Sequence, residues 1–409
     1  MRKNVIHTLN FRALIKSNFW NYSLFVILAL IILCFGFLSK GMNLSGRNIT
    51  NILFQSSYVL ILAVGMAQCI IIHGIDLSVS SVCIFIGILS TLIYNTGGGI
   101  PGTVLGSLLI GFIIGAFQGW FIAYHKVPAF IVTLAGMWVF RGLTYIVTNS
   151  KPVYLKDDVY SYLATGTVDG DLLKLSDPVF FNISGRIFNY FPVPFIAGCI
   201  TLVLFWVMEF INRRNKTTNG FGVSPLVIFL AKLLFISILI CFIAERFASY
   251  RGFPIVVIVL AVTAAIFHFI INKTVLGRYI YAIGSNAPSS KLFGINTEFI
   301  TFIVYCFMGI LAGLAGVIST GLMNFAYPSA VNPLETGIVD AIAACYIGGV
   351  STSGNTGSVI GVIVGGLIMG TLNNGMALMN LNAHYQLAVK ALFLLLAVFF
   401  NVSTRRKTE

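Results

Sequence analysis

The chain has 409 residues, of which 58% are hydrophobic and only 9% are charged. A soluble domain carries about 25% charged residues, so the composition excludes an ordinary soluble protein and indicates a helical membrane protein. The apolar runs are continuous rather than alternating, which excludes a membrane β-barrel. The formal net charge of +13 comes from basic residues at the ends of apolar runs, so it predicts membrane anchoring rather than nucleic-acid binding.

Twelve apolar runs approach or exceed the length of about 20 residues that a membrane span needs. In chain order they are 22–38, 52–72, 78–94, 103–123, 129–147, 192–211, 225–244, 253–271, 298–318, 336–350, 357–379 and 384–400. The tenth is short and rich in Gly and Ala, which is typical of a broken or partly inserted helix. We therefore expect an all-α fold with about 10–12 transmembrane helices in a single transmembrane domain, residues 1–409.

The first run lies behind four basic residues, Arg2, Lys3, Arg12 and Lys16. A secretory signal peptide would have a shorter leader and a small-residue cleavage site. We therefore expect the first run to remain in the protein as an uncleaved span.

The basic residues predict the orientation of the chain. If both termini are cytoplasmic, the inner loops hold His125–Lys126, the basic stretch 213–216, and Lys273, Arg278 and Lys291. The outer loops then hold the segment 148–191, which contains five of the twelve acidic residues; Lys40 and Arg47 are the exceptions. An excess of Lys and Arg on the cytoplasmic side is the usual arrangement, so we expect a multi-pass protein with both termini inside.

Two segments interrupt the regular succession of spans. The loop 148–191 is long for a compact connection, so we expect it to carry a small external element. Residues from about 192 to 250 contain two spans and a basic inner loop, and we expect them to form an extra helical hairpin on a core bundle.

The sequence lacks the motifs of common membrane enzymes and ATPases. It contains no GxxxxGK[ST] loop, no HExxH and no nucleophile elbow, and its seven cysteines include no CxxC pair. We therefore expect no catalytic residue, metal or cofactor in this chain, and any nucleotide must be hydrolysed by a partner.

Asp76, in "IIIHGIDLSVSS" (70–81), is the most prominent acid near a membrane boundary. Ionisable groups at membrane depth are costly and tend to be functional. Asp76 followed by Ser78 also makes a sensible N-cap region for the third span, and this is the interpretation we favour. Turn architecture and direct contact with a transported solute both remain open.

Asp340 holds a similar place in the second half, at the start of "DAIAACYIGG" (340–349). It is suited to cap a half-helix in the short tenth run, because small residues allow close helix packing. Interrupted helices also line the pathways of transporters, so pathway lining is the alternative.

Gln68, Arg141, Asn373 and Asn374 are further polar residues inside apolar runs. The candidates for lining a translocation pathway are therefore seven: Asp76, Ser78, Gln68, Arg141, Asp340, Asn373 and Asn374. Arg141 is the most costly and must reach a partner, water or an interface. The two asparagines are suited to hydrogen bonds between helices or to lining a pathway. No chain of spaced Asp, Glu and His residues suggests a proton relay, which argues against an ion-coupled transporter.

Five blocks occur together, in this order. They are "LAVGMAQCIIIHGIDLSVSSV" (62–82), "KVPAFIVTLAGMWVFRGLTYIVTN" (126–149), "LGRYIYAIGSNAPSSKLFGIN" (276–296), "DAIAACYIGGVSTSGNTGSVIGVIVGGLIMGTLNNGMALM" (340–379) and "YQLAVKALFLLLAVFF" (385–400). From about Asn43 onward, the chain resembles the permease subunits of bacterial ATP-binding-cassette (ABC) importers for monosaccharides, the ribose and xylose permease family. The added hairpin at about 192–250 makes the longer, xylose-type branch more similar.

The resemblance implies the ABC importer permease fold in the bacterial inner membrane, two permease copies, cytoplasmic ATPase subunits and an external sugar-binding protein. It implies that 276–296 is a cytoplasmic coupling loop. The residues at that ATPase contact would be Arg278, Tyr279, Gly284, Asn286, Lys291, Leu292, Gly294 and Ile295. This chain departs from the family at Ala287-Pro288-Ser289-Ser290, where an acid and alanines are usual, and at His73 and Ser80, where glycines are usual.

The function expected from the resemblance is import of a monosaccharide, a xylose-type pentose or a hexose, with ATP hydrolysed by a separate subunit. The transported solute remains open within this class, and nucleosides or other small polar solutes are alternatives. An ion-coupled secondary transporter and a membrane enzyme are the rivals from other classes.

Overall fold

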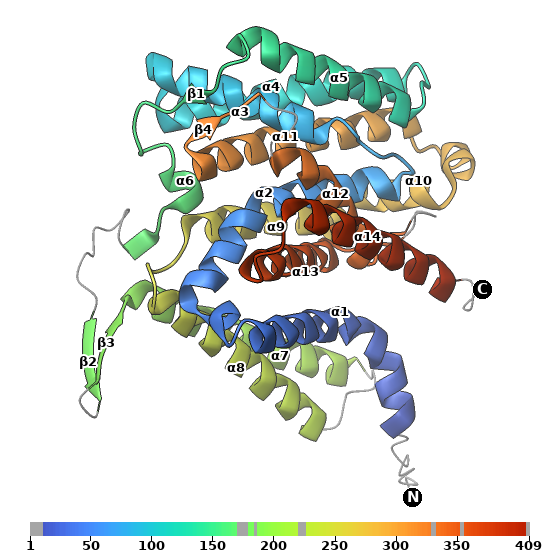
Figure 1. The fold of residues 1–409 in the computed structure, drawn as a ribbon. Helices are drawn as coiled ribbons and strands as arrows, with labels where there is room; N and C mark the ends of the chain where they lie inside the picture. Colours follow the sequence, from blue (N-terminus) through green and yellow to red (C-terminus); the bar gives the residue numbers. More distant parts are fainter. Residues whose placement is uncertain are drawn as a thin grey trace, which may run out of the picture.

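The computed structural model describes residues 11–169, 179–183, 186–219, 226–328, 333–351 and 356–405. In this part of the chain, every one of the twelve predicted runs falls on a helix, so the all-α fold class is confirmed. These helices are α1 Phe11–Leu38, α2 Gly46–Ile71, α3 Val79–Ile93, α4 Gly99–Ala123, α5 Ala129–Thr148, α7 Pro192–Thr218, α8 Leu226–Ala248, α9 Ile255–Lys273, α11 Thr297–Met323, α12 Pro333–Ile347, α13 Val359–Leu378 and α14 Ala383–Arg405 (Figure 1).

The remaining elements are short, except for one additional helix, α10 Val275–Leu292, in the segment predicted as a coupling loop. The short ones are the helical turns η1 Met42–Leu44, η2 Tyr94–Gly98 and α6 Tyr162–Thr165, and the strands β1 Val153–Tyr154, β2 Val179–Ile183, β3 Arg186–Tyr190 and β4 Phe325–Ala326.

Seven helical segments in the described residues are long and apolar enough to cross a membrane: α2, the stretch from α3 to α4 taken as one, α5, α7, α9, α11 and α13. Shorter apolar helices lie within α1, α12 and α14. With 15 residues, α12 is about 22 Å long, less than the roughly 30 Å of a hydrocarbon core. Its length agrees with the expectation of a broken or partly inserted helix.

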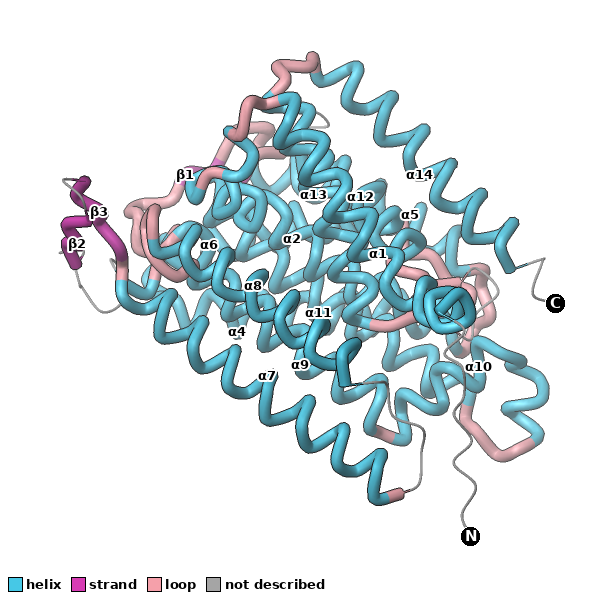
Figure 2. The backbone as a smooth tube through the Cα atoms, turned by 90° about the horizontal axis from the view of Figure 1, so that it is seen from below, coloured by secondary structure: helices cyan, strands magenta, loops and turns pink. Residues whose placement is uncertain are grey.

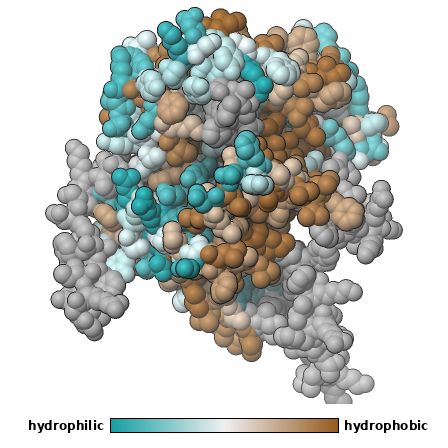
Figure 3. All heavy atoms as spheres, viewed as in Figure 1, coloured by the Kyte–Doolittle hydropathy of each residue, from teal (hydrophilic) through white to brown (hydrophobic). Residues whose placement is uncertain are grey.

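The core of the molecule is built around α2 (Figure 1). The most apolar 18-residue stretch of this helix is 94% buried. The helices α8, α9, α11, α12 and α13 pack around it. In contrast, the corresponding 18-residue stretches of α5 and α7 are only 11% and 6% buried. Figure 3 shows a broad hydrophobic area on the face in view, with hydrophilic side chains gathered at the left, over β1 and α6. This distribution is that of a bundle whose peripheral helices face lipid.

Small residues bring α4 and α11 into close contact. A Cβ placed on Gly111 would collide with the carbonyl oxygen of Gly309, and one on Gly309 would collide with that of Gly111. Gly115 and Gly313 meet backbone carbonyls of the opposite helix in the same way. The four-residue spacing of these glycines lets the two backbones touch along one stripe, which is a common way to pack helices in membranes.

The helices α7 and α8 form a hairpin over the segment 192–250, along one edge of the bundle (Figure 2). Lys232 of α8 pairs with Glu209 of α7 at 2.7 Å. At the opposite end, the buried Asp169 accepts hydrogen bonds of 2.9 Å from the backbone N–H groups of Val193 and Phe253. This carboxylate ties the start of α7 and the turn before α9 to the loop that follows α6.

The connections between helices gather at two ends of the bundle, as alternating crossings require. At one end, β1 pairs antiparallel with β4, and Val168 N–H donates to the carbonyl of Phe253. Part of the long 148–191 loop is therefore ordered against this end, where Tyr160 is buried and its hydroxyl lies 2.7 Å from that of Ser90. The other end holds α10 and the turn between α4 and α5.

Candidate functional site

The segment 276–296 is helical for most of its length rather than a loop. The helix α10 begins after Thr274, whose hydroxyl accepts from the N–H of Gly277. At Asn286 the backbone leaves the helical conformation (φ −162°, ψ 98°). The side chain of Asn286 then accepts a 2.9 Å hydrogen bond from Ser289 N–H, as an N-cap does. The segment is thus two helical pieces, with a break at Asn286.

The unusual Ala287-Pro288-Ser289-Ser290 stretch is explained by this break. Pro288 lies in the first turn of the second piece, where its missing N–H and fixed φ are tolerated. This piece ends at Gly294, which has φ +80°. The N–H of Ile295 donates to the carbonyl of Ser290 and that of Gly294 to Lys291. These bonds form a Schellman ending, which requires a left-handed residue at the Gly294 position.

The predicted coupling residues fall into two groups by exposure. Exposed are Arg278, Tyr279, Asn286, Lys291, Leu292 and Gly294, whereas Gly284 is buried and Ile295 is half-buried. Leu292 and its neighbour Phe293 are 89% and 86% exposed. Phe293 was absent from the predicted set, although an aromatic residue beside a helix-ending glycine in a polar segment is a recognisable signal. The sequence did not indicate that Gly284 and Ile295 lie on the side facing the bundle.

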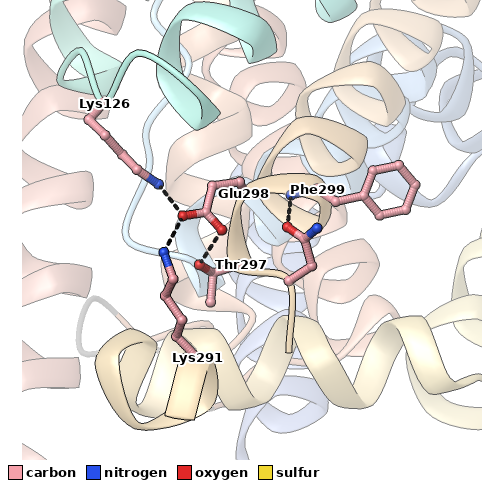
Figure 4. Close-up of polar contacts among 6 residues, drawn as sticks. Lys126, Lys291, Thr297, Glu298 and Phe299 are labelled. Atoms are coloured by element: carbon pink, nitrogen blue, oxygen red, sulfur yellow. Dashed lines mark hydrogen bonds and ion pairs between the residues drawn. The ribbon is translucent and has the colours of Figure 1, made fainter. Parts of the chain in front are cut away.

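Glu298, in the first turn of α11, joins three segments (Figure 4). Its carboxylate accepts from the ammonium groups of Lys291 at 2.8 Å and Lys126 at 3.0 Å, and from the hydroxyl of Thr297 at 3.1 Å. The end of α10 is therefore connected through α11 to the turn between α4 and α5. We refer to Lys126, Lys291 and Glu298 as the Glu298 junction.

The Glu298 junction lies at the surface end of α11. Glu298 is the second residue of this helix, and the side chains of its partners Lys126 and Lys291 are 63% and 66% exposed. The hydrogen bonds from Lys291 and Lys126 lower the pKa of Glu298 to about 2. The carboxylate therefore stays ionised throughout the neutral range.

A second contact connects α10 to the other half of the chain. The hydroxyl of Tyr281 donates a 2.7 Å hydrogen bond to the carbonyl of Gly357, just before α13. A displacement of α10 would thus act on the turn before α5 and on the connection before α13 at the same time.

Asp76 lies in a buried turn between α2 and α3 and is only 4% exposed. Its carboxylate accepts from the N–H of Ser78 at 2.8 Å and from the hydroxyl of Ser78 at 2.6 Å. Ser78 precedes the first residue of α3 and also bonds Gln118 of α4 at 2.9 Å. The turn expected for Asp76 and Ser78 is therefore present, with Gln118 as an additional member, but the Ser78 side chain makes no capping bond to α3, so the expected cap is absent.

Asp340 does not cap a helix, so that expectation is wrong. The helix α12 begins at Pro333, seven residues earlier, and Asp340 lies in its middle. Its Oδ2 atom accepts from Asn373 of α13 at 2.8 Å and pairs with Lys390 of α14 at 3.2 Å. Lys390 was missed, although a single lysine inside the last apolar run was a signal, because charged residues are rare there.

The other polar residues of the predicted pathway lie apart from this contact. Asn374 exchanges hydrogen bonds with Asn48 of α2, at 2.8 and 3.0 Å. Gln68 is buried and donates to the carbonyl of Val64 in its own helix. Arg141 stacks over the exposed ring of Trp138 on α5, 5.0 Å from its centroid. Of the seven residues predicted to line a pathway, the structure brings Asp340 together with Asn373, and Asp76 together with Ser78. It does not bring all seven together at one place.

Metal-binding side chains do not gather in the described part of the chain, where no three His, Cys, Asp or Glu residues come together.

Comparisons with known proteins agree with this architecture. Residues 48–398 match the family model described as branched-chain amino acid transport system / permease component. The xylose transport system permease protein XylH of Haemophilus influenzae is 35% identical over 387 residues, covering 94% of this chain and 97% of that protein. XylH of Escherichia coli K12 is 34% identical, covering 95% and 94%.

The ribose import permease protein RbsC of Escherichia coli K12 is 32% identical over 352 residues, covering 86% of this chain and 84% of that protein. No solved structure matches. The matched residues take in the spans from α2 to α14, the segment 276–296 and the Asp340 contact. The chain therefore belongs to the family of multi-pass membrane permease components of transport systems that includes the xylose and ribose permeases.

Proposed function

We propose that this chain is the transmembrane subunit of an ATP-driven importer that moves a monosaccharide, a xylose-type pentose or a hexose, into the cytoplasm. The observation that carries the proposal is the similarity over nearly the whole chain to two xylose permeases and a ribose permease. The sequence has no phosphate-binding loop of its own, so ATP is hydrolysed on a separate subunit.

The coupling element in this proposal is α10. Its exposed end, Leu292 and Phe293, offers an apolar contact to a groove on the ATPase, and Arg278 and Lys291 add positive charge beside it. Motion of the ATPase then reaches the bundle through the Glu298 junction and through the bond from Tyr281 to Gly357. A single ATPase contact at α10 thereby moves both α11 and the connection before α13.

The proposed orientation puts both termini and α10 in the bacterial cytoplasm. It rests on the excess of Lys and Arg in the loops at that end. The opposite end, where β1 pairs with β4 and α6 packs, then faces the external sugar-binding protein. We also propose that two copies of this permease form the transport unit, as the family resemblance implies.

Other solutes are possible within the same class. The family description names branched-chain amino acids, and nucleosides or other small polar solutes are further alternatives. The relatives that match along almost the whole chain are named for xylose and ribose, which favours a sugar. An ion-coupled transporter without an ATPase is the rival from another class.

Reconstitution tests the proposal. The permease is placed in proteoliposomes with the ATPase and the sugar-binding protein encoded beside it, and uptake of labelled D-xylose, D-ribose, D-glucose, L-leucine and uridine is measured with and without ATP. Uptake of a sugar that needs ATP, ATPase and binding protein supports the proposal. Uptake driven by an ion gradient alone, or only of leucine or uridine, would overturn it.

A further inference from the structure

Lys390 and Asp340 form an ion pair in the interior of the bundle. The side chain of Lys390 is 12% exposed and that of Asp340 only 4%. Lys390 lies seven residues into α14 and Asp340 seven residues into α12, which places both about 10 Å along their helices. Charged side chains at such depth are costly and are usually retained for a function.

The pair leaves hydrogen-bonding capacity unused. Asp340 Oδ1 and Asn373 Oδ1 are buried, and neither has a hydrogen-bond partner among the described residues. The Lys390 ammonium group has three N–H donors, and one of them is directed at Asp340 Oδ2. Two acceptors without a partner and a cationic donor thus belong to one hydrogen-bonded cluster between α12, α13 and α14.

The neighbouring asparagine shows what a purely structural contact looks like here. Asn374 and Asn48 exchange donor and acceptor in both directions, so the two amides satisfy each other. Asn373 donates to Asp340, but its own oxygen receives nothing from the described residues. A buried ion pair is also a weak source of stability, because well-packed apolar side chains often serve as well.

We propose that Asp340, Asn373 and Lys390 form a binding point for the hydroxyl groups of the transported sugar. A hydroxyl both donates and accepts. One sugar hydroxyl donates to Asp340 Oδ1 or Asn373 Oδ1, and a hydroxyl oxygen accepts from Lys390. This inference rests on the proposed transport of a sugar, and it adds the residues and the chemistry of recognition within the bundle.

The binding point is closed in the conformation described, since the two acceptor oxygens are buried. Opening it requires movement of α14, which lies at the edge of the bundle (Figure 2) and has Leu392 and Leu395 61% and 65% exposed. The sugar then replaces contacts that α14 makes to α12 when the site is closed. Asp340 and Lys390 therefore both close the empty site and bind the cargo.

The test measures whether these residues recognise individual hydroxyls. ATP-driven uptake of D-xylose, or of D-ribose if the wild type prefers it, is compared with uptake of its monodeoxy analogues. The comparison is made for wild type, Asp340→Asn, Asn373→Ala and Lys390→Met. For each variant, the result is the ratio of intact-sugar uptake to analogue uptake. The same binding protein is used with every variant, so its own selectivity affects all of these ratios equally. For at least one hydroxyl, we expect the wild-type preference for the intact sugar to fall about tenfold in a variant, as loss of a hydrogen bond to a charged group predicts.

Controls separate this outcome from a structural effect. Lys232→Met removes the comparable ion pair between α7 and α8 and should leave every analogue ratio unchanged. If a single variant does not fold, the exchanged pair Asp340→Lys with Lys390→Asp is used, and we expect it to fold but to discriminate analogues differently from wild type. The inference would be overturned if every folded variant had the wild-type ratio of intact-sugar to analogue uptake. It would also be overturned if the exchanged pair fully restored the wild-type uptake ratios. Absence of wild-type sugar uptake would instead contradict the proposed function.

Discussion

At the scale of single residues, position within a turn decides how costly a side chain is. His73 ends α2 with φ +63°, and the N–H of Gly74 donates to the carbonyl of Cys69. This is a Schellman ending whose left-handed residue is normally glycine. Glycine reaches that conformation without the steric cost that a side chain introduces. His73 thus occupies a position whose backbone conformation favours glycine.

His73→Gly should therefore stabilise the protein slightly. We expect the free energy of unfolding to rise by about 0.5–1 kcal/mol, since relief of left-handed strain exceeds the entropic cost of glycine. Thermal unfolding of the purified permease in detergent measures the change. His73→Val should lower the melting temperature because β-branched residues tolerate positive φ poorly. A lower melting temperature for His73→Gly would show that the imidazole makes a stabilising contact.

Glu298→Gln should weaken coupling more than stability. The variant loses both ion pairs of the Glu298 junction, each of which is at the surface and contributes about 1 kcal/mol or less. We expect sugar uptake per ATP hydrolysed to fall up to about fivefold, the equivalent of about 1 kcal/mol. Glu245→Gln, which breaks the pair with Arg246 on α8, is the control and should keep the wild-type ratio.

The pH dependence of the Glu298 junction follows from its lowered pKa. A carboxylate whose pKa is depressed in the folded state contributes stability above its unfolded pKa of about 4.3, and this is lost as the pH falls toward 2. We therefore expect the difference in uptake between wild type and Glu298→Gln to stay constant from pH 5 to pH 8. A difference that disappears near pH 6 would mean that another group controls the junction.

At the scale of elements, close contact between backbones determines which substitutions a helix accepts. Gly111 and Gly309 touch across α4 and α11, whereas the Cβ of an alanine at position 102, on the same α4, would meet nothing within 4 Å. The two glycines therefore set the distance between the helices, and Gly102 does not. The sequence alone does not distinguish Gly102 from Gly111; only the packing of α4 against α11 does.

Gly309→Leu should destabilise the bundle strongly. A side chain at this position collides with the carbonyl of Gly111 and forces α4 and α11 apart, and overpacking of this kind typically costs about 1–3 kcal/mol. The amount of monodisperse protein in detergent and its melting temperature should both fall. Gly102→Leu is the matched control and should behave as wild type; equal losses for both variants would show that the close contact is not limiting.

Sequence patterns predicted the elements better than their connections. Run length and composition were sufficient for all twelve apolar helices, because a span must be long and apolar whatever surrounds it. The break at Asn286 was not predicted, since it depends on an asparagine side chain turning back to the backbone. The pairing of Lys390 with Asp340 joins residues 50 positions apart, and the start of α12 at Pro333 moved Asp340 from a cap to mid-helix. Such contacts depend on tertiary packing, which periodicity does not encode.

At the scale of the whole molecule, the arrangement of loops predicts which residues face the same compartment. Lys291 belongs to the end that carries α10, and Asn95 lies at the opposite end, where it bonds Tyr154. Single cysteines at these positions, in a variant from which the native cysteines are removed, should react from opposite sides of the membrane. We expect a membrane-impermeant maleimide added to intact cells to label Asn95→Cys, and Lys291→Cys only after lysis. The reverse pattern would invert the proposed orientation.

The burial of α2 has a consequence for how the protein is made. This early helix carries the fully or almost fully buried polar side chains of Thr50, Ser57 and Gln68, and α11, α12 and α13 enclose it. The enclosing helices are synthesised more than 200 residues later. During translation α2 must therefore remain in lipid, or with an insertion factor, with Ser57 and Gln68 bonded to carbonyls of their own helix. The core closes only when the last third of the chain arrives, so in a nascent chain arrested before α11 the face of α2 that α11, α12 and α13 cover stays unpacked.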